Sequence, residues 1–146
     1  MGEKTECYPD ELVEKVVSQY LTGIGAKLLN QAQWVATQDW FLLYEGFLDI
    51  GRRLLLTIMG LNRVWAFTDN PDFKGWKCFV GSFAWQPDHF IERLGLLLQS
   101  NASASIQGFA DLIEEVLVSI DVKFGSVGTS DEWEMLKQIR GNTTDS

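Results

Sequence analysis

The sequence predicts an all-α protein: an antiparallel bundle of five or six helices around one long central helix. Three observations favour this class. Apolar residues recur at helical spacings of three and four along most of the chain. No segment shows strand-like alternation between paired turn signals. Residues 38–67 form a proline-free, strongly apolar stretch, and the mostly short connections favour antiparallel neighbours.

Length and composition indicate one domain. The chain has 146 residues, 46% hydrophobic and 22% charged, which is typical of a single globular domain spanning 1–146. We expect residues 1–7 and 142–146 to be disordered. The formal charge of −8 disfavours nucleic acid and membrane partners, because a surface for phosphate groups needs an excess of basic side chains.

Cysteine and histidine content argues against a zinc site. Two cysteines, Cys7 and Cys78, and the single histidine, His89, cannot supply four ligands. Reduced thiols and a cytoplasmic location are the expectation. The first twelve residues carry several charges and do not resemble a signal peptide. The uncharged stretch of eight residues at 54–61 is too short to span a bilayer.

Two shorter helices are expected before the long one. A proline followed by two acidic residues within 8–11 is typical of a helix start. Apolar residues then recur at helical spacing over 12–21. Gly23 and Gly25 interrupt the pattern, and a second helix carries the apolar residues of 24–34.

The long helix is expected over residues 38–67, with Thr37 as its N-cap. Thirty helical residues would extend about 45 Å. Turn residues and a proline at 68–71 end it. Its predicted core face consists of Trp40, Leu43, Phe47, Ile50, Leu54, Ile58, Leu61 and Trp65.

The following segment, 72–85, is either a short helix or an ordered aromatic loop, and we favour the short helix. Another helix is expected to open at 86–88 and to carry His89 exposed in its first turn. Residues 100–105 are small and polar, which predicts a connection.

Two helices complete the chain. Apolar spacing from Ile106 predicts a helix that closes at Gly125. Thr129 and Glu132 match a capping box at the start of the last helix, which is expected to end at Gly141.

A charged edge on the long helix is the main indication of function. At about 100° per residue, Glu45, Asp49, Arg52 and Arg63 share one edge. In one interpretation the edge is solvated and braced by pairs such as Asp49 with Arg53, each contributing about 0.2–0.5 kcal/mol. In the other it faces a cleft or partner domain, where Arg52 and Arg63 hold an anionic group with their planar guanidinium forks.

The sequence shows no catalytic constellation. It lacks a Gly-rich phosphate loop, a Gly-x-Ser-x-Gly nucleophile elbow and a Glu-x-x-His metal pattern. Glu114 and Glu115 are neighbours on a helix and point apart. We therefore expect no catalytic residue, metal site or cofactor in this chain. An aromatic cluster with two lysines indicates either core packing, which we prefer, or a stacking platform: Trp76, Phe79, Phe83 and Trp85 with Lys74 and Lys77.

Several motifs carry a family resemblance over roughly residues 8–120. They are Tyr8-Pro9 with Leu12, Tyr44-Glu45, Gly60-Leu61-Asn62-Arg63, Lys74-Gly75-Trp76-Lys77, Gln86-Pro87-Asp88-His89-Phe90 and the stretch from Phe109 to Leu117. With them the chain resembles the C-terminal helical, substrate-binding domain of bacterial nucleotidyltransferase-like proteins. That domain is related to the helical half of aminoglycoside nucleotidyltransferases.

The resemblance implies a substrate-binding module that is non-catalytic by itself. Its cleft residues would be Glu45, Asp49, Arg52, Asn62 and Arg63, bordered by Lys74, Trp76 and Lys77. Magnesium and a nucleoside triphosphate would belong to a partner catalytic domain, which transfers a nucleotide to a small-molecule or protein acceptor. No Gly-Ser and Asp-x-Asp element precedes Tyr8, so that domain would lie on a separate chain or on a missing part of the same chain.

Two alternatives belong to other classes. One is a protein-interaction or oligomerisation bundle, such as a regulatory or antitoxin-like partner or a homodimer. The other is a binder of a small apolar ligand between helices, which is consistent with the six tryptophans.

Overall fold

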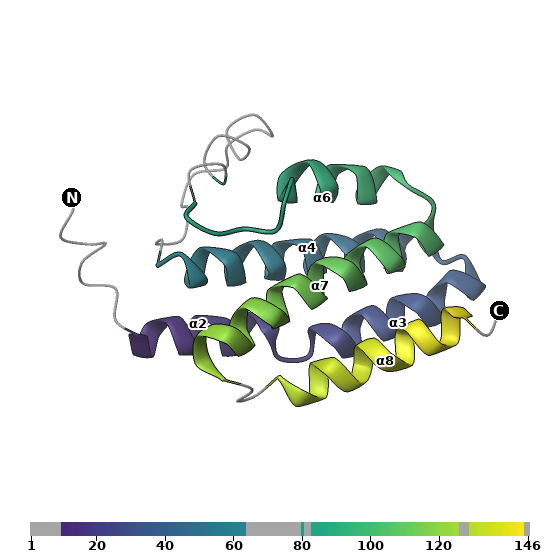
Figure 1. Cartoon of the computed structure of the whole chain (residues 1–146). Helices are drawn as coiled ribbons and strands as arrows, with labels where there is room; N and C mark the ends of the chain where they lie inside the picture. Colours follow the sequence, from purple (N-terminus) through teal and green to yellow (C-terminus); the bar gives the residue numbers. More distant parts are fainter. Residues whose placement is uncertain (1–9, 64–79, 81–82, 126–128, 145–146) are drawn as a thin grey trace.

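The computed structural model describes residues 10–63, 80, 83–125 and 129–144. In these residues it contains helices and no strand, which confirms the predicted all-α class. The helices, labelled as in Figure 1, are α2 (Asp10–Leu21), α3 (Ile24–Thr37), α4 (Trp40–Leu61), α6 (Phe90–Gln99), α7 (Ala102–Phe124) and α8 (Ser130–Thr144).

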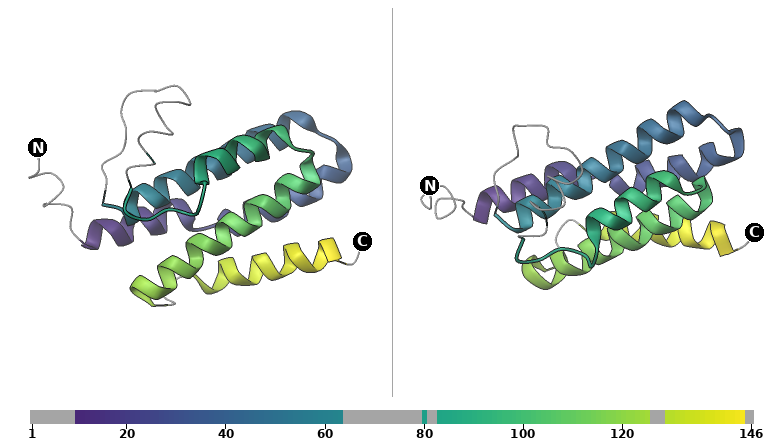
Figure 2. Two further views of the ribbon diagram at one scale, coloured as in Figure 1. Left: turned by 45° about the horizontal axis from the view of Figure 1, so that its top comes forward. Right: turned by 90° about the horizontal axis from the view of Figure 1, so that it is seen from above.

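From α3 onward, each helix runs opposite in direction to the one before it (Figures 1 and 2). Helices α2 and α3 follow one another along one side and α4 runs back over both of them (Figures 1 and 2). The pairs α6–α7 and α7–α8 are also antiparallel neighbours. The prediction of one long central helix is incomplete, because α7 has 23 residues against 22 in α4. Both contact α3 and α6 as well as each other.

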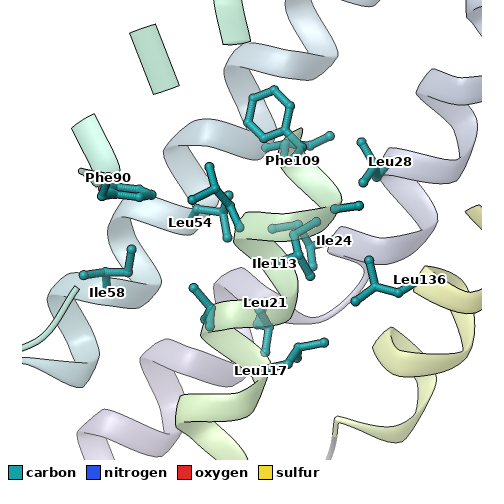
Figure 3. Close-up of a cluster of buried hydrophobic side chains, with 14 of the residues drawn as sticks. Leu21, Ile24, Leu28, Leu54, Ile58, Phe90, Phe109, Ile113, Leu117 and Leu136 are labelled. Carbon is teal, nitrogen blue, oxygen red and sulfur yellow. The ribbon is translucent and has the colours of Figure 1, made fainter. Parts of the chain in front are cut away.

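The core lies where α4 and α7 meet the remaining helices (Figure 3). Leu54 and Ile58 from α4 face Phe109, Ile113 and Leu117 from α7, all of them fully buried. The predicted core face of α4 is confirmed at six positions: Leu43, Phe47, Ile50, Leu54, Ile58 and Leu61.

Trp40 contradicts that prediction. Its side chain is 56% exposed, and it is the first residue of α4, at the edge of the bundle. The rings of Phe47 and Phe109 instead stack at a centroid distance of 5.5 Å and anchor this half of α4 on α7. Trp65 lies outside the described residues.

The long helix is shorter than predicted at both ends. Thr37 is the last residue of α3, and Asp39 is the N-cap of α4, accepting a hydrogen bond from the Leu42 amide. At the other end Asn62 and Arg63 form a turn, with Arg63 at a φ of 57°. The 22 helical residues therefore extend about 33 Å rather than about 45 Å.

Three other boundaries also differ from the expectation. Helix α6 begins at Phe90, after His89, which is exposed as expected but has a left-handed φ of 56°. The connection predicted at 100–105 is confined to Ser100 and Asn101, because the Asn101 side chain caps α7 by accepting from the Ala104 amide. Helix α8 continues to Thr144, past Gly141.

Most of the segment 72–85, for which the sequence favours a short helix, lies outside the described residues.

The Glu132 carboxylate joins α8 to the start of α3, which differs from the predicted capping box. Glu132 is only 4% exposed. Its Oε1 accepts from the Gly25 amide at 2.9 Å and its Oε2 from the Gly23 amide at 3.5 Å. Free amides and the helix dipole make this helix end favourable for a buried carboxylate. Gly23 permits the approach with a φ of 85°, which glycine adopts without strain.

Helices α3 and α4 meet at a glycine. The Gln31 side chain is 1% exposed, and its Nε2 donates to the Leu43 carbonyl at 2.7 Å. A Cβ placed on Gly46 would lie 2.1 Å from Gln31 Oε1. The absence of a side chain at Gly46 therefore lets the amide of Gln31 lie against the backbone of α4.

Gly46→Ala is expected to lower the free energy of unfolding by about 1–3 kcal/mol, because the new methyl group displaces the buried Gln31 amide. Gly51→Ala is the matched control in the same helix. Its Cβ would lie 3.6 Å from Leu94, an ordinary contact. Both changes gain helix propensity, so urea unfolding should rank Gly51→Ala well above Gly46→Ala. Equal stability of the two variants would contradict the close contact.

Candidate functional site

The predicted charged edge of α4 lies in a groove between α3 and α4. The groove has a volume of about 750 Å³, within the usual size of small-molecule sites. It brings Glu45, Asp49 and Arg52 together, as the sequence predicted. The remaining lining residues are Lys27, Asn30, Gln31, Trp34, Leu42, Gly46, Leu48 and Arg53.

Asp49 is the centre of the charged groups in this groove. Its Oδ2 lies 2.9 Å from Lys27 Nζ on α3 and 3.0 Å from Arg53 Nε. Its Oδ1 lies 2.9 Å from Arg52 Nη2. The arginines are three and four residues further along α4, which places them on the same face as Asp49. Arg53 also donates to the Tyr20 carbonyl of α2 at 3.4 Å.

The ionisation of Asp49 follows from these contacts. The Asp49 side chain is only 20% exposed, and burial alone would raise its pKa. Hydrogen bonds from Lys27, Arg52 and Arg53 outweigh that effect, and the pKa lies well below its ordinary value of 3.8. Asp49 is therefore a carboxylate at any physiological pH.

The groove carries positive charge on a strongly acidic protein. Its ionised side chains are three cations and two carboxylates, a net charge of +1, whereas the whole chain has a formal charge of −8. Arg52 is the most accessible cation, with 71% of its side chain exposed, and only its Nη2 contacts Asp49. Because a guanidinium has five N–H donors, Arg52 retains donors for an anionic group in the groove.

Asn62 does not belong to this groove. Its Nδ2 donates to the carbonyls of Ile58 at 2.8 Å and Trp85 at 2.7 Å. Its Oδ1 accepts from the Trp85 amide at 2.9 Å. These three hydrogen bonds use the side chain to hold the segment before α6 against the end of α4, which is a structural role.

Arg63 is also separate from Arg52. The prediction that they share one edge assumed a helix through residue 67, but α4 ends at Leu61 and helical periodicity does not extend to Arg63. Arg63 does not line the groove. Lys74, Trp76 and Lys77, expected at the border of the cleft, lie outside the described residues.

Sequence reasoning missed the contribution of α3. Lys27 and Gln31 are on the helix preceding the charged edge, and the spacing of residues within α4 says nothing about that neighbour. The polar residues Lys27, Asn30 and Gln31 recur at helical spacing between the apolar positions of α3, and this pattern was the available signal.

The remaining candidate groups have structural roles. Glu114 pairs with Arg140 of α8 at 3.0 Å, and Glu115 pairs with Arg93 of α6 at 2.5 Å, so the adjacent carboxylates do point to different helices. Of the aromatic cluster, Phe83 and Trp85 pack against the hydrophobic core, as preferred. Within the described ranges no group of three or more His, Cys, Asp and Glu side chains could hold a metal ion.

An exposed apolar stripe adjoins the groove on α4. Trp40, Phe41, Tyr44 and Leu48 are between 54% and 77% exposed. At about 100° per residue these four side chains fall within about 100° of the helix circumference. Leu48 also lines the charged groove, so the stripe is continuous with it.

Comparisons with family models, curated proteins and solved structures find no match for this chain. Among the described helices, none has both the length and the hydropathy needed to cross a bilayer.

Asp49→Asn is expected to lower the free energy of unfolding at neutral pH by about 1–2 kcal/mol, because three cations lose their shared carboxylate. The folded-state pKa of Asp49 is depressed, so its stabilisation is present above the unfolded-state pKa and is lost as the pH falls through the folded-state pKa. The difference between wild type and variant should be constant from about pH 5 to 7 and shrink between about pH 4 and 2.

Denaturant unfolding across this pH range measures the difference, and Glu45→Gln is the control from the same groove. A pH-independent difference, or an equal effect of both changes, would contradict the role of Asp49.

Proposed function

We propose that this chain is a helical substrate-binding module of a nucleotidyltransferase, non-catalytic by itself, which holds an anionic group of the acceptor in the α3–α4 groove. One observation carries the binding role: Lys27, Arg52 and Arg53 surround a single carboxylate in a groove of ligand size. The motif resemblance supports the nucleotidyltransferase context. Magnesium and the nucleoside triphosphate would belong to the partner catalytic domain, and the acceptor is a small molecule or a protein.

The geometry suggests a division of roles in the groove. Arg52 is the exposed fork for a phosphate or carboxylate, and Lys27, with 44% of its side chain exposed, adds a second charge from α3. Arg53 is tied to Asp49 and to the Tyr20 carbonyl, which makes it a positioning residue. Glu45 supplies an exposed acceptor for hydroxyl or amine groups of the same ligand.

Arg52→Ala is expected to weaken binding of inorganic phosphate about tenfold, because a charge-assisted hydrogen bond is removed. The melting temperature should change little, since an exposed ion pair contributes at most about 1 kcal/mol. Two-dimensional NMR titration measures the affinity. Lys137→Ala, which removes an exposed cation from α8, is the control and should bind phosphate normally. Equal phosphate affinity in both variants would contradict the proposed site.

The nucleotidyltransferase context has its own test. A reading frame beside this coding sequence, or continuous with it, should encode a Gly-Ser and Asp-x-Asp domain. Purified together, the two should transfer a nucleotide in the presence of magnesium, and Arg52→Ala should lower kcat/KM for the acceptor. Transfer at an undiminished rate by the catalytic domain alone would contradict a substrate-binding role.

The exposed stripe favours a second candidate function, a protein-interaction or oligomerisation bundle. Contiguous exposed apolar patches often mark interaction sites, and aromatic residues are enriched at the centres of protein interfaces. Trp40, Phe41 and Tyr44 supply three aromatic side chains on one strip of α4.

Light scattering tests this alternative. If the stripe forms a homodimer, the wild type should have twice the mass of one chain, and the double change Phe41→Ser with Tyr44→Ser should return it to a monomer. Val118→Ser with Val122→Ser removes two exposed apolar side chains from α7 and should leave the mass unchanged. A wild type that is monomeric at high concentration would exclude the homodimer.

A further inference from the structure

A second, apolar groove lies on the other side of the Leu48–Arg52 ridge, between α4 and α6. Its volume is about 380 Å³. Arg52 is the one charged residue among those that line it. The other lining residues are Phe47, Leu48, Gly51, Leu55, Ile91, Leu94, Gly95, Leu98 and Phe109.

Glycine keeps one wall of this groove open. A Cβ on Gly51 would find only ordinary contacts, 3.6 Å from Leu94 Cδ2 and 4.0 Å from Phe109 Cε1. A methyl group would therefore fit at this position, and a larger side chain would extend into the groove that Gly51 lines. The α6 wall runs from Ile91 to Leu98, which is about 10 Å along the helix axis.

Arg52 and Leu48 line both grooves. The Arg52 guanidinium shares the Asp49 carboxylate with Lys27 and Arg53, so the edge of the apolar groove next to the α3–α4 groove carries positive charge. A ligand that matches this arrangement has an anionic head and an apolar chain.

We propose that the α4–α6 groove takes the apolar chain of a medium-length anionic amphiphile, with a carboxylate or phosphate head held by Arg52. The inference rests on the proposed function, because the head would use the same guanidinium as the anionic group of the acceptor. It adds the ligand class: an acyl-chain acid rather than a purely polar acceptor. Apolar walls with one charged group at the edge are typical of sites for such ligands.

Calorimetric titration with a series of fatty acids tests the proposal. Affinity should rise from acetate through hexanoate and octanoate to decanoate, by about fourfold for each methylene group until the groove is filled. Arg52→Gln should weaken decanoate binding at least tenfold and leave the neutral analogue decanol unchanged.

The second part of the experiment changes the lining of the groove, first by filling it with a larger side chain. In Gly51→Leu, the affinity for fatty acids should no longer rise with chain length, and in Gly51→Ala it should rise less than in the wild type. Both variants should retain phosphate binding by the α3–α4 groove. A thermal melt shows whether Gly51→Leu is folded. If it is not, Leu98→Asn, which makes the opposite wall of the groove polar, provides the same test. Lys137→Ala is the control and should bind decanoate with the same affinity as the wild type.

Three results would overturn the inference: equal affinity for acetate and decanoate, equal effects of Arg52→Gln on decanoate and decanol, or undiminished decanoate binding in both Gly51→Leu and Leu98→Asn. Retention of phosphate binding in any of these cases would leave the proposed anion site standing. Loss of the phosphate response itself in the wild type would instead refute the proposed function.

Discussion

The buried amide of Gln31 lies against the α4 backbone at Gly46, and the α3–α4 groove depends on that contact. Both residues line the groove, and the hydrogen bond to the Leu43 carbonyl fixes the amide in place. With α3 at this spacing, Lys27 lies within 2.9 Å of Asp49. The Glu132 carboxylate holds the start of the same helix from the other side, through the amides of Gly23 and Gly25. The position of α3 therefore determines which charged side chains lie next to one another.

As a consequence, the α3–α4 groove has a net positive charge although the protein as a whole is acidic. Three cations face two carboxylates in the groove, so its net charge of +1 favours an anionic ligand, whereas the chain as a whole carries a formal charge of −8. Arg52 lies on the ridge between this groove and the apolar groove against α6. One exposed guanidinium therefore adjoins a polar surface on one side and a hydrocarbon-like surface on the other. The exposed aromatic stripe continues the apolar surface toward the start of α4.

Much of this fold was predictable, because apolar spacing along a helix directly reports its buried face. The six confirmed core positions of α4 follow from that rule. Helix ends were less predictable: Asp39 replaced Thr37 as the cap, and the turn at Asn62 and Arg63 ended α4 before the apolar sequence did. Of the site, periodicity within α4 predicted Glu45, Asp49 and Arg52, since all three lie on one uninterrupted helix. It could not predict Lys27, which reaches the site through the packing of another helix, nor the separation of Arg63, which follows from the end of α4.

Side-chain NMR during a phosphate titration tests whether the three cations around the Asp49 carboxylate act as a single anion site. If they do, the Nζ signal of Lys27 and the guanidinium signals of Arg52 and Arg53 should shift together, with one dissociation constant. The signal of Lys137, an exposed cation on α8, should not move over the same range. Shifts of equal size at Lys137 and at the three groove cations, or no shift at Arg52, would contradict a single anion site in this groove.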